Sequence, residues 1–566
     1  MHLQGFRRGA GRVSGAARTR MRHRVGMPPA FEGGHRTRQG GPGMQRLRTW
    51  LLALCTLLCM GTAPAATLRV ASAFDPQTMD PHALALLYHA RVSTQIYDAL
   101  VHRDARYRLE PALALSWRAA AATRWQFRLR PGVRFHDGSA FTAVDAKFSL
   151  ERAMAPPSLR SFQLRGVRAV RVLDPLAIEI ELDAPDALLP EKLFGVAMMN
   201  KAWSEQHGVT TAQDFNARQE TFATRNANGT GPFRLLRYEP DARTTLERFD
   251  GYWGWQDSRS GNVQQAQFVV IKSDATRLAA LTSGEVDAVL DPPYQDIARL
   301  RNDARLTVLS IADLGQQYLA FDQARDELQD SDVQGRNPFK DLRVRQAVYH
   351  ALNVPLIVDK VLRGQAQATG AFLSPLLDGV PAELDRRLPY DPALARQRLA
   401  EAGYPDGVAV TLDCVNVAWR ENVCQAMAAM LTQVGIRTRL RSSVSTVFFP
   451  KLSQGQASFM EFGWTPGMDP YLSLNALLRS HDPSGLGSFN AGRYSNPKLD
   501  ALIDQIRVEP DPEHRRTLVA TALRLVHEEL PLVPLYRRTL NWALARKVHA
   551  VQWPSDMVEL RWVRLR

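Results

Sequence analysis

The chain has 566 residues and a formal net charge of +14, and 45% of its residues are apolar, 8% aromatic and 23% charged. This length corresponds to about three domains of roughly 150 residues, and the composition excludes a disordered or collagen-like chain. Residues 1–66 hold 11 arginines and one acidic residue, whereas the other 500 residues carry 60 basic and 56 acidic side chains. Because the excess positive charge belongs to the leader, the charge argues against nucleic acid as the main partner.

Residues 44–66 have the layout of a secretory signal peptide. Arginines precede an apolar run from Trp50 to Met60, and small residues close the segment. The run is too short to span a bilayer as a mature helix, so we expect export to the periplasm and removal of this segment. Residues 1–43 are rich in Arg and Gly and show no periodicity. We interpret them as a non-native extension before a true start at Met44, with an organelle transit sequence as the alternative.

Four cysteines divide into two pairs. Cys55 and Cys59 lie inside the apolar run, and each follows a leucine where a lipid-attachment cysteine needs a small residue. A soluble exported protein is therefore expected rather than a lipid-anchored one. Cys414 and Cys424 remain in the mature chain, and in an oxidising compartment they are expected to form one local disulfide. Two buried thiols are the alternative.

The mature chain begins with a predicted strand, Thr67–Ala71, and then alternates strands with helices. Between residues 125 and 138, apolar residues at every second position are broken by Pro-Gly and ended by Asp-Gly, which predicts hairpins. Thr142 is expected to cap the helix that follows. Another helix is expected to begin at Ser273 or Asp274 and to end at Gly284, before a strand over residues 285–290.

The second half of the chain repeats this pattern. Helices are expected to begin at Asp341, Asp391, Glu421 and Asn496, the second ending at Gly403, and strands are expected at residues 408–415 and 438–441. Strands that alternate with helices over several hundred residues predict α/β layers. No internal repeat or long linker separates the units, so they are expected to be interwoven.

No enzyme signature accompanies this pattern. The stretch Gly229–Pro232 lacks the Lys-Ser/Thr of a phosphate-binding loop, and residues 527–529 (HEE) lack the second histidine of a zinc-protease helix. No Gly-x-Ser-x-Gly elbow occurs. We therefore expect a binding protein without catalytic residues, metal site or cofactor. A secreted hydrolase with unrecognised carboxylates stays open, because such a pair needs only spatial proximity.

Nine short motifs follow one another in order over residues 67–560. They are residues 75–81 (DPQTMDP), 95–100 (QIYDAL), 130–138 (RPGVRFHDG), 141–145 (FTAVD), 228–233 (NGTGPF), 252–254 (YWG), 283–287 (SGEVD), 338–339 with 344–347 (PF, VRQA) and 401–405 (EAGYP). In this order they resemble the family 5 extracellular solute-binding proteins, the peptide and nickel type that feeds ABC importers. Each motif is weak alone, and the series is specific.

The resemblance implies an α/β fold of the periplasmic binding protein type II kind, with two closing lobes and a third, inserted lobe. The expected boundaries are 67–104, 228–312 and 532–566 for lobe I, 105–227 for the inserted lobe II, and 313–531 for the closing lobe III. A ligand that contacts both closing lobes shifts the open–closed equilibrium by as much as it binds the closed form better.

The resemblance also implies ligand contacts. In peptide binders of this family a tryptophan packs on the ligand, and an acidic residue three positions later pairs with the peptide ammonium, a buried charge that needs a carboxylate. Trp464 matches that tryptophan, but the third residue after it is Gly467. Asp469 matches a later Asp-Pro of the motif and takes the ammonium role if the loop shifts. The alternative is an aspartate that starts a turn before Pro470.

Three further residues are candidates for the ligand site. Tyr318 and Phe321 resemble the family's cleft-facing strand, although Asp322 stands where the family usually has Asn. Both side chains either line the pocket or pack in the core. Met79, in the first motif, is the third candidate. Many family members also carry a cysteine pair at the positions of Cys414 and Cys424, which supports the disulfide.

The sequence thus predicts a monomeric periplasmic binding protein that delivers a short peptide or peptide-like solute to the permease subunits of an ABC importer in the inner membrane. The altered loop after Trp464 keeps an alternative open, in which the same fold binds a metal chelate, haem, an opine or an oligosaccharide.

Overall fold

The computed structural model describes residues 66–566 except 216, 445, 446, 449, 450, 453, 466–468 and 483–485. The extension and the signal peptide expected from the sequence lie outside the described residues, apart from Ala66 at the end of the latter. Gly467, which departs from the family motif, lies outside them as well.

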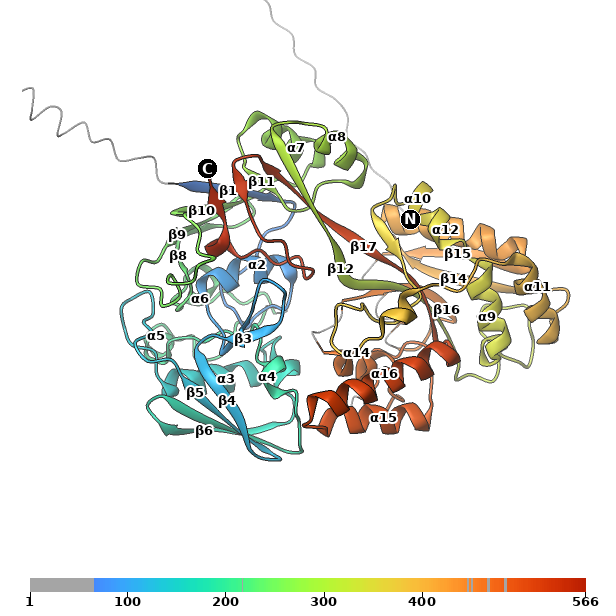
Figure 1. Cartoon of the computed structure of the whole chain (residues 1–566), viewed down its shortest axis with the longest axis horizontal. Helices are drawn as coiled ribbons and strands as arrows, with labels where there is room; N and C mark the ends of the chain where they lie inside the picture. The colour runs from blue at the N-terminus through green and yellow to red at the C-terminus, as the bar shows by residue number, and fades with distance from the viewer. Residues whose placement is uncertain are drawn as a thin grey trace, which may run out of the picture. The chain divides into compact units, whose positions relative to one another are not determined.

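A mixed sheet of eleven strands forms the framework (Figure 1). Its order is β15 (Ile436–Ser443), β14 (Val408–Val415), β16 (Phe459–Trp464), β12 (Leu306–Phe321), β17 (Leu532–Ala545), β11 (Ala288–Val289), β1 (Thr67–Ser72), β10 (Gln265–Val270), β9 (Arg243–Arg248) and β8 (Phe233–Glu239), with β13 (Ala366–Ala368) also paired to β17. Strand β1 is parallel to β10 and β11, and β14 is parallel to β15 and β16. The other pairs are antiparallel.

The two longest strands, β12 and β17, join the two halves of this sheet (Figure 1). They pair antiparallel from Leu306 opposite Ala545 to Ala320 opposite Leu532. Only the second half of β12 also pairs with β16, where Gln316 lies opposite Trp464. The β12–β17 register shifts twice near this point, so the sheet is irregular where its halves meet.

A second, antiparallel sheet lies within residues 105–227, the segment predicted as the inserted lobe. Its order is β4 (Ala114–Ala121), β5 (Arg124–Leu129), β7 (Ala177–Leu182) and β6 (Val167–Asp174). The same segment holds α3 (Ala143–Met154), α4 (Leu189–Lys192), α5 (Lys201–Gln206) and α6 (Phe222–Arg225), and the hairpin β2 (Val101–Arg103) and β3 (Leu109–Pro111) leads into it. The lobe boundaries themselves stay a prediction.

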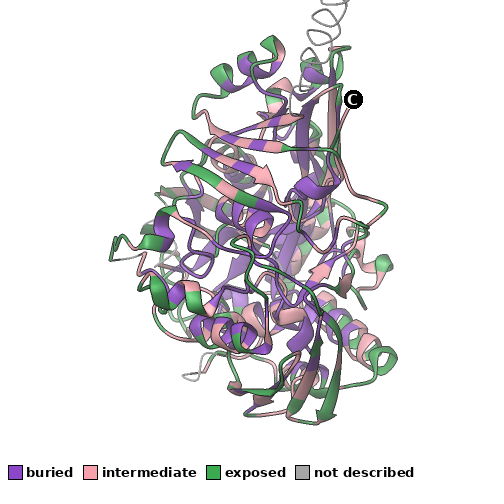
Figure 2. Cartoon of the chain, turned by 90° about the vertical axis from the view of Figure 1, so that its left-hand side faces the viewer, coloured by how far each residue is buried: buried purple, intermediate pink, exposed green. Residues whose placement is uncertain are grey.

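The remaining helices cover the large sheet, and buried residues gather between the layers (Figure 2). They are α2 (Leu87–Ile96), α7 (Asp274–Ser283), α8 (Ile297–Arg301), α9 (Leu342–Ala351), α10 (Val354–Lys360), α11 (Pro392–Glu401), α12 (Ala418–Gln433), α14 (Pro470–Leu477), α15 (Pro497–Val508) and α16 (Pro512–Glu529). Short 3₁₀ turns are η1 (Ser161–Leu164), η2 (Tyr294–Asp296), η3 (Pro338–Lys340), η4 (Ala382–Asp385) and η5 (Leu560–Trp562), and β18 (Val548–His549) pairs with β19 (Arg564–Leu565). The α/β class predicted from the sequence is confirmed.

Helix ends follow the local signals closely. The Asp391 carboxylate accepts hydrogen bonds from the first turn of α11, which opens on Pro392, and Gly403 follows the helix in a left-handed conformation at φ +88°. Ser273 caps α7 in the same way, and Gly284 ends it at φ +81°. These predictions are confirmed.

The hairpins expected over residues 125–138 are confirmed only in part. Residues 125–129 lie in β5, which forms an antiparallel hairpin with β4 and also pairs with β7, and the Asp-Gly turn closes a single antiparallel bridge between Arg134 and Ala140. The apolar residues after Pro-Gly, Val133 and Phe135, lie in a buried loop and not in a strand, and they pack in the core of the second sheet. The strand expected at residues 285–290 is shorter than predicted, with only Ala288 and Val289 paired.

Cys414 and Cys424 form a disulfide. It joins Cys414 near the end of β14 to Cys424 in α12, with Cα atoms 6.7 Å apart. Both residues are fully buried in the core cluster of the β14–α12 layer. The disulfide expected from the sequence is therefore present in the structure.

Candidate functional site

A group of polar residues lies at the irregular part of β12, where its register with β17 shifts. Residues 313–315 fall between the two registers of the β12–β17 pair. The Asp313 carboxylate accepts a hydrogen bond from the Gly315 backbone N–H at 2.8 Å. A Cβ atom at Gly315 would lie 3.1 Å from that carboxylate and from the Thr465 hydroxyl. Glycine therefore lets the bulge close against the end of β16.

An ion pair spans this bulge. The Arg538 guanidinium, from β17, donates to Asp313 through Nε at 3.1 Å and Nη2 at 2.7 Å. The Arg538 side chain stays 35% exposed, while Asp313 is 5% exposed. Burial opposes the charge on Arg538, but the neighbouring Asp313 carboxylate outweighs it and raises the pKa of the guanidinium. The pair is open to solvent on the arginine side.

Aromatic side chains lie around the same point. Trp464, at the end of β16, is partly buried, donates from Nε1 to the Ser473 hydroxyl at 3.0 Å and contacts the Phe489 ring, 5.2 Å away between centroids. Phe489 is 58% exposed. Tyr294, in η2, interacts with Arg538 and is also partly exposed. We call Tyr294, Asp313, Trp464, Thr465 and Arg538 the crossover site.

The crossover site combines the flat ring of Trp464 with the Arg538 guanidinium, which Asp313 holds in place. Guanidinium groups held by one carboxylate can bind a second one, because the planar fork carries five N–H donors. Aromatic rings such as those of Trp464 and Phe489 bind apolar or extended ligands with little loss of side-chain entropy. Such a surface suits recognition of a solute that has an apolar part and a carboxylate.

The structure places the residues predicted from the sequence in different surroundings. Trp464 belongs to the crossover site. Tyr318 and Phe321 are 0% exposed, and Met79 is 1% exposed, so all three lie in cores of the protein. The Tyr318 hydroxyl donates to the Phe372 carbonyl at 2.5 Å.

Asp469 is 6% exposed, and both its carboxylate oxygens have partners within the chain. Oδ1 accepts the Tyr471 backbone N–H at 2.8 Å, which caps α14, and Oδ2 pairs with Arg515. Sequence reasoning missed the other four residues of the crossover site, Tyr294, Asp313, Thr465 and Arg538. Two consecutive arginines, Arg537 and Arg538, inside a largely apolar strand were the available signal.

Comparisons with known proteins agree with this architecture. The model of the bacterial extracellular solute-binding proteins, family 5, matches residues 108–485, more than half of the chain. Heme-binding protein A of Haemophilus influenzae is 26% identical over 470 residues, which cover 78% of this chain and 82% of that protein. The glutathione-binding protein GsiB of an Escherichia coli strain is 26% identical over 502 residues, which cover 86% of this chain and 91% of that protein.

Solved structures show the same fold. The periplasmic binding protein DppA from Helicobacter pylori, solved in complex with the peptide STSA, superposes with a TM-score of 0.70 at 23% identity, covering 88% of this chain and 98% of that one. The fold is that of the type II periplasmic binding proteins, as the sequence predicts.

The chain belongs to the family 5 extracellular solute-binding proteins, the solute-binding components of ABC importers. Its relatives are named as binding proteins and not as enzymes. Within the described residues, no helix is both long and apolar enough to cross a membrane.

Proposed function

We propose that this protein is exported to the periplasm, binds a short peptide or peptide-like solute between its two closing lobes, and presents it to the permease of an ABC importer. The observation that carries this proposal is the similarity to a glutathione-binding protein over 91% of that protein's length. Glutathione has peptide bonds, an ammonium group and carboxylates. The protein acts by binding and closure, as a monomer, and the solute leaves it chemically unchanged.

The crossover site supplies the contacts in this proposal. Trp464 packs on the backbone or an apolar side chain of the ligand. Arg538 binds a ligand carboxylate with the part of its guanidinium that Asp313 does not occupy. Closure of the lobes removes this ion pair from water and strengthens it, which favours the closed form once the ligand is bound.

The other four residues predicted from the sequence contact the ligand only under further conditions. Asp469 binds the ligand ammonium only if it releases Arg515 or the Tyr471 N–H, its present partners. Tyr318, Phe321 and Met79 act beneath the site by packing, unless the backbone around them moves.

The engagement of Asp469 favours a second candidate, in which the same fold carries a non-peptide solute. A buried ammonium without a carboxylate partner is costly, and a ligand that lacks an ammonium avoids this cost at the crossover site. Haem, a metal chelate, an opine and an oligosaccharide are the classes considered, and one relative is named for heme binding.

Native mass spectrometry of the protein purified from periplasm separates these candidates. Release of a series of short peptides, or of glutathione, on denaturation supports the proposal. A single non-peptide mass overturns the peptide class and supports the second candidate. Prolonged incubation with the released solute then tests for chemistry, because full recovery of the unchanged solute contradicts a hydrolase.

A further inference from the structure

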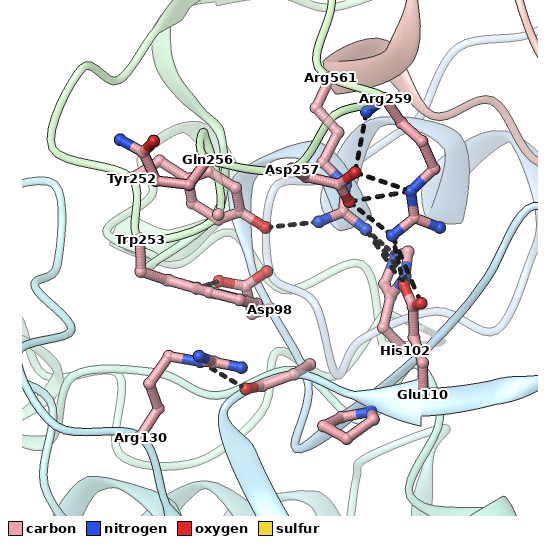
Figure 3. Close-up of a pocket in the computed structure, with 13 residues that line it drawn as sticks. Asp98, His102, Glu110, Arg130, Tyr252, Trp253, Gln256, Asp257, Arg259 and Arg561 are labelled. Carbon is pink, nitrogen blue, oxygen red and sulfur yellow. Dashed lines mark hydrogen bonds and ion pairs between the residues drawn. The ribbon is translucent and has the colours of Figure 1, made fainter.

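A cavity that none of the crossover-site residues lines lies where the hairpin β2–β3 leads into the segment predicted as the inserted lobe (Figure 3). Its volume is about 260 Å³, and its walls come from Asp98 just after α2, from the hairpin β2–β3, from Arg130 just after β5, from the loop over residues 252–259, and from η5 near the C-terminus. This volume is below the roughly 300–1,000 Å³ of pockets for drug-sized ligands, yet it exceeds that of several waters. A ligand with few heavy atoms fits it.

Most charged groups in the wall neutralise one another. Arg259 pairs with Asp257 and Glu110, and Arg561 pairs with Glu559 behind the wall and contacts His102. Figure 3 shows this cluster on one side of the cavity. These side chains have protein partners and do not need a ligand.

Two charged groups on the other side have no ionic partner among the described residues. Asp98 is 7% exposed, and its Oδ2 accepts neutral hydrogen bonds from the Thr230 hydroxyl at 2.9 Å and the Trp253 indole N–H at 3.0 Å. The Arg130 guanidinium lies 4.1 Å from the centre of the Trp253 ring, and its Nε donates to the Ala112 carbonyl at 3.0 Å. Within the described part of the chain, no carboxylate lies within ion-pair distance of its two terminal nitrogens.

The surroundings leave Asp98 an unsatisfied charge. Burial raises its pKa to about 6, and the hydrogen bonds from Trp253 and Thr230 and the more distant charge of Arg561 lower it only in part. Burial likewise lowers the pKa of the Arg130 guanidinium, and the neighbouring Tyr252 and Asp98 oppose this shift only in part. Each group would gain from an opposite charge placed inside the cavity.

Both groups contact the same indole, Arg130 on its face and Asp98 at its edge (Figure 3). They are therefore one ring apart, and both line the cavity. A simple anion would be attracted by Arg130 and repelled by the Asp98 carboxylate. A simple cation would be attracted by Asp98 and repelled by Arg130. A small molecule with a cationic and an anionic end satisfies both.

We propose that the cavity lined by Asp98, Arg130 and Trp253 is a second binding site, which takes a small zwitterion of the free amino acid class. The ligand ammonium donates to Asp98, and the ligand carboxylate accepts from the terminal nitrogens of Arg130. Because the cavity wall includes both the hairpin that enters the inserted lobe and the C-terminal η5, a bound zwitterion ties these segments together.

Equilibrium dialysis with labelled glycine tests this site on the full mature protein freed of its bound solute. The variants are Asp98→Asn, which keeps an acceptor for Thr230 and Trp253, and Arg130→Gln. Trp464→Ala separates this cavity from the crossover site. We expect wild type and Trp464→Ala to bind glycine alike and each cavity variant to bind it at least tenfold more weakly.

Two further readouts strengthen the test. Acetate and methylammonium each carry half of the zwitterion, so each alone is expected to compete poorly with glycine. Binding to wild type is expected to weaken about tenfold from pH 7.5 to pH 5, because Asp98 takes up a proton around pH 6. The groups that face Asp98 are Arg130, Arg561, His102 and Tyr252, and the Asp98→Asn variant shows which part of the profile belongs to Asp98.

Three outcomes overturn the proposal. If both cavity variants bind glycine as wild type does, glycine binds outside the cavity. If Trp464→Ala abolishes glycine binding, glycine binds at the crossover site. If wild type does not bind glycine at millimolar concentration, the cavity holds only water. Thermal unfolding of each variant shows whether it is folded, and the result is independent of which solute the crossover site carries.

Discussion

Two arginine–aspartate pairs with the same chemistry occupy opposite surroundings in this protein. The pair of Arg152 and Asp80 joins α3 to the loop after β1, and both side chains are 0% exposed. The pair of Arg538 and Asp313 joins β17 to β12, and its arginine is 35% exposed. Geometry alone does not separate them, because both have charge-assisted hydrogen bonds of 2.6–2.7 Å.

The two pairs differ in how many donors the protein uses. Arg152 donates to Asp80 from both terminal nitrogens, and its other bonds go to His82 and to the carbonyls of Val209 and Thr211. All five of its N–H groups are engaged. The bonds that Arg538 makes to a carboxylate go to a single oxygen. A saturated pair fixes structure, and a pair with donors to spare can bind a ligand.

The largest expected effect is on the saturated pair. Asp80→Asn leaves the Arg152 charge buried without its counterion, which costs about 3–5 kcal/mol of unfolding free energy. Urea unfolding of the purified mature protein measures this. Asp104→Asn removes an aspartate paired with the exposed Arg108 and is expected to cost at most about 1 kcal/mol. Equal losses in the two variants would contradict the assignment.

Asp98 extends the comparison, because it is a buried carboxylate that has no ion pair among the residues the structure describes. The pKa of Asp98 is raised from 3.8 to about 6. Between these values the folded state holds the proton that the unfolded state has lost, so stability falls as the pH rises through this range. The change amounts to about 3 kcal/mol at roughly 1.4 kcal/mol per pKa unit.

Asp98→Asn removes this dependence. The variant is expected to match wild type near pH 4 and to exceed its unfolding free energy at pH 7.5, because a neutral amide replaces a buried charge. Urea unfolding at both pH values checks this. A variant that is less stable than wild type at pH 7.5 would show that the Asp98 charge is satisfied in the folded protein.

Trp464 tests the crossover site, to which the solvent-exposed pair of Arg538 and Asp313 belongs. Trp464→Ala is expected to weaken glutathione or peptide binding about 30-fold, or about 2 kcal/mol, which is typical of a tryptophan at the centre of a binding surface. Titration calorimetry measures this, and Trp464→Phe, which keeps an apolar ring, should lose less. Unchanged affinity in the alanine variant would move the ligand away from the crossover site.

Local features of this fold were predictable from the sequence because their causes lie within a few residues. The start of α11 at Pro392 and its end before Gly403 depend on backbone hydrogen bonds and on glycine's left-handed conformation. The family motifs likewise predicted the α/β fold and its class. The prediction of hairpins over residues 125–138 held for β5 but not for Val133 and Phe135, because a buried loop produces the same apolar alternation as a strand.

The site was less predictable because its parts are far apart in the chain. Arg538 and Asp313 are 225 residues apart, and no local pattern pairs them. Tyr318 and Phe321 follow the family's cleft-facing strand, but β12 lies between β16 and β17 and is covered on both faces. Alternation along such a central strand does not distinguish a ligand-facing side from a core side.

The smallest expected effect on stability comes from removing both charges of the open pair. The double variant Asp313→Asn, Arg538→Gln leaves no uncompensated charge, so its unfolding free energy is expected to stay within about 1 kcal/mol of wild type. Its affinity for trialanine should fall about tenfold, or about 1.4 kcal/mol, while its affinity for trialanine amide should not change, since only the carboxylate contacts Arg538. Titration of both peptides measures the difference. Equal losses for acid and amide would mean that Arg538 positions β17 and does not bind the ligand, and both pairs would then be structural.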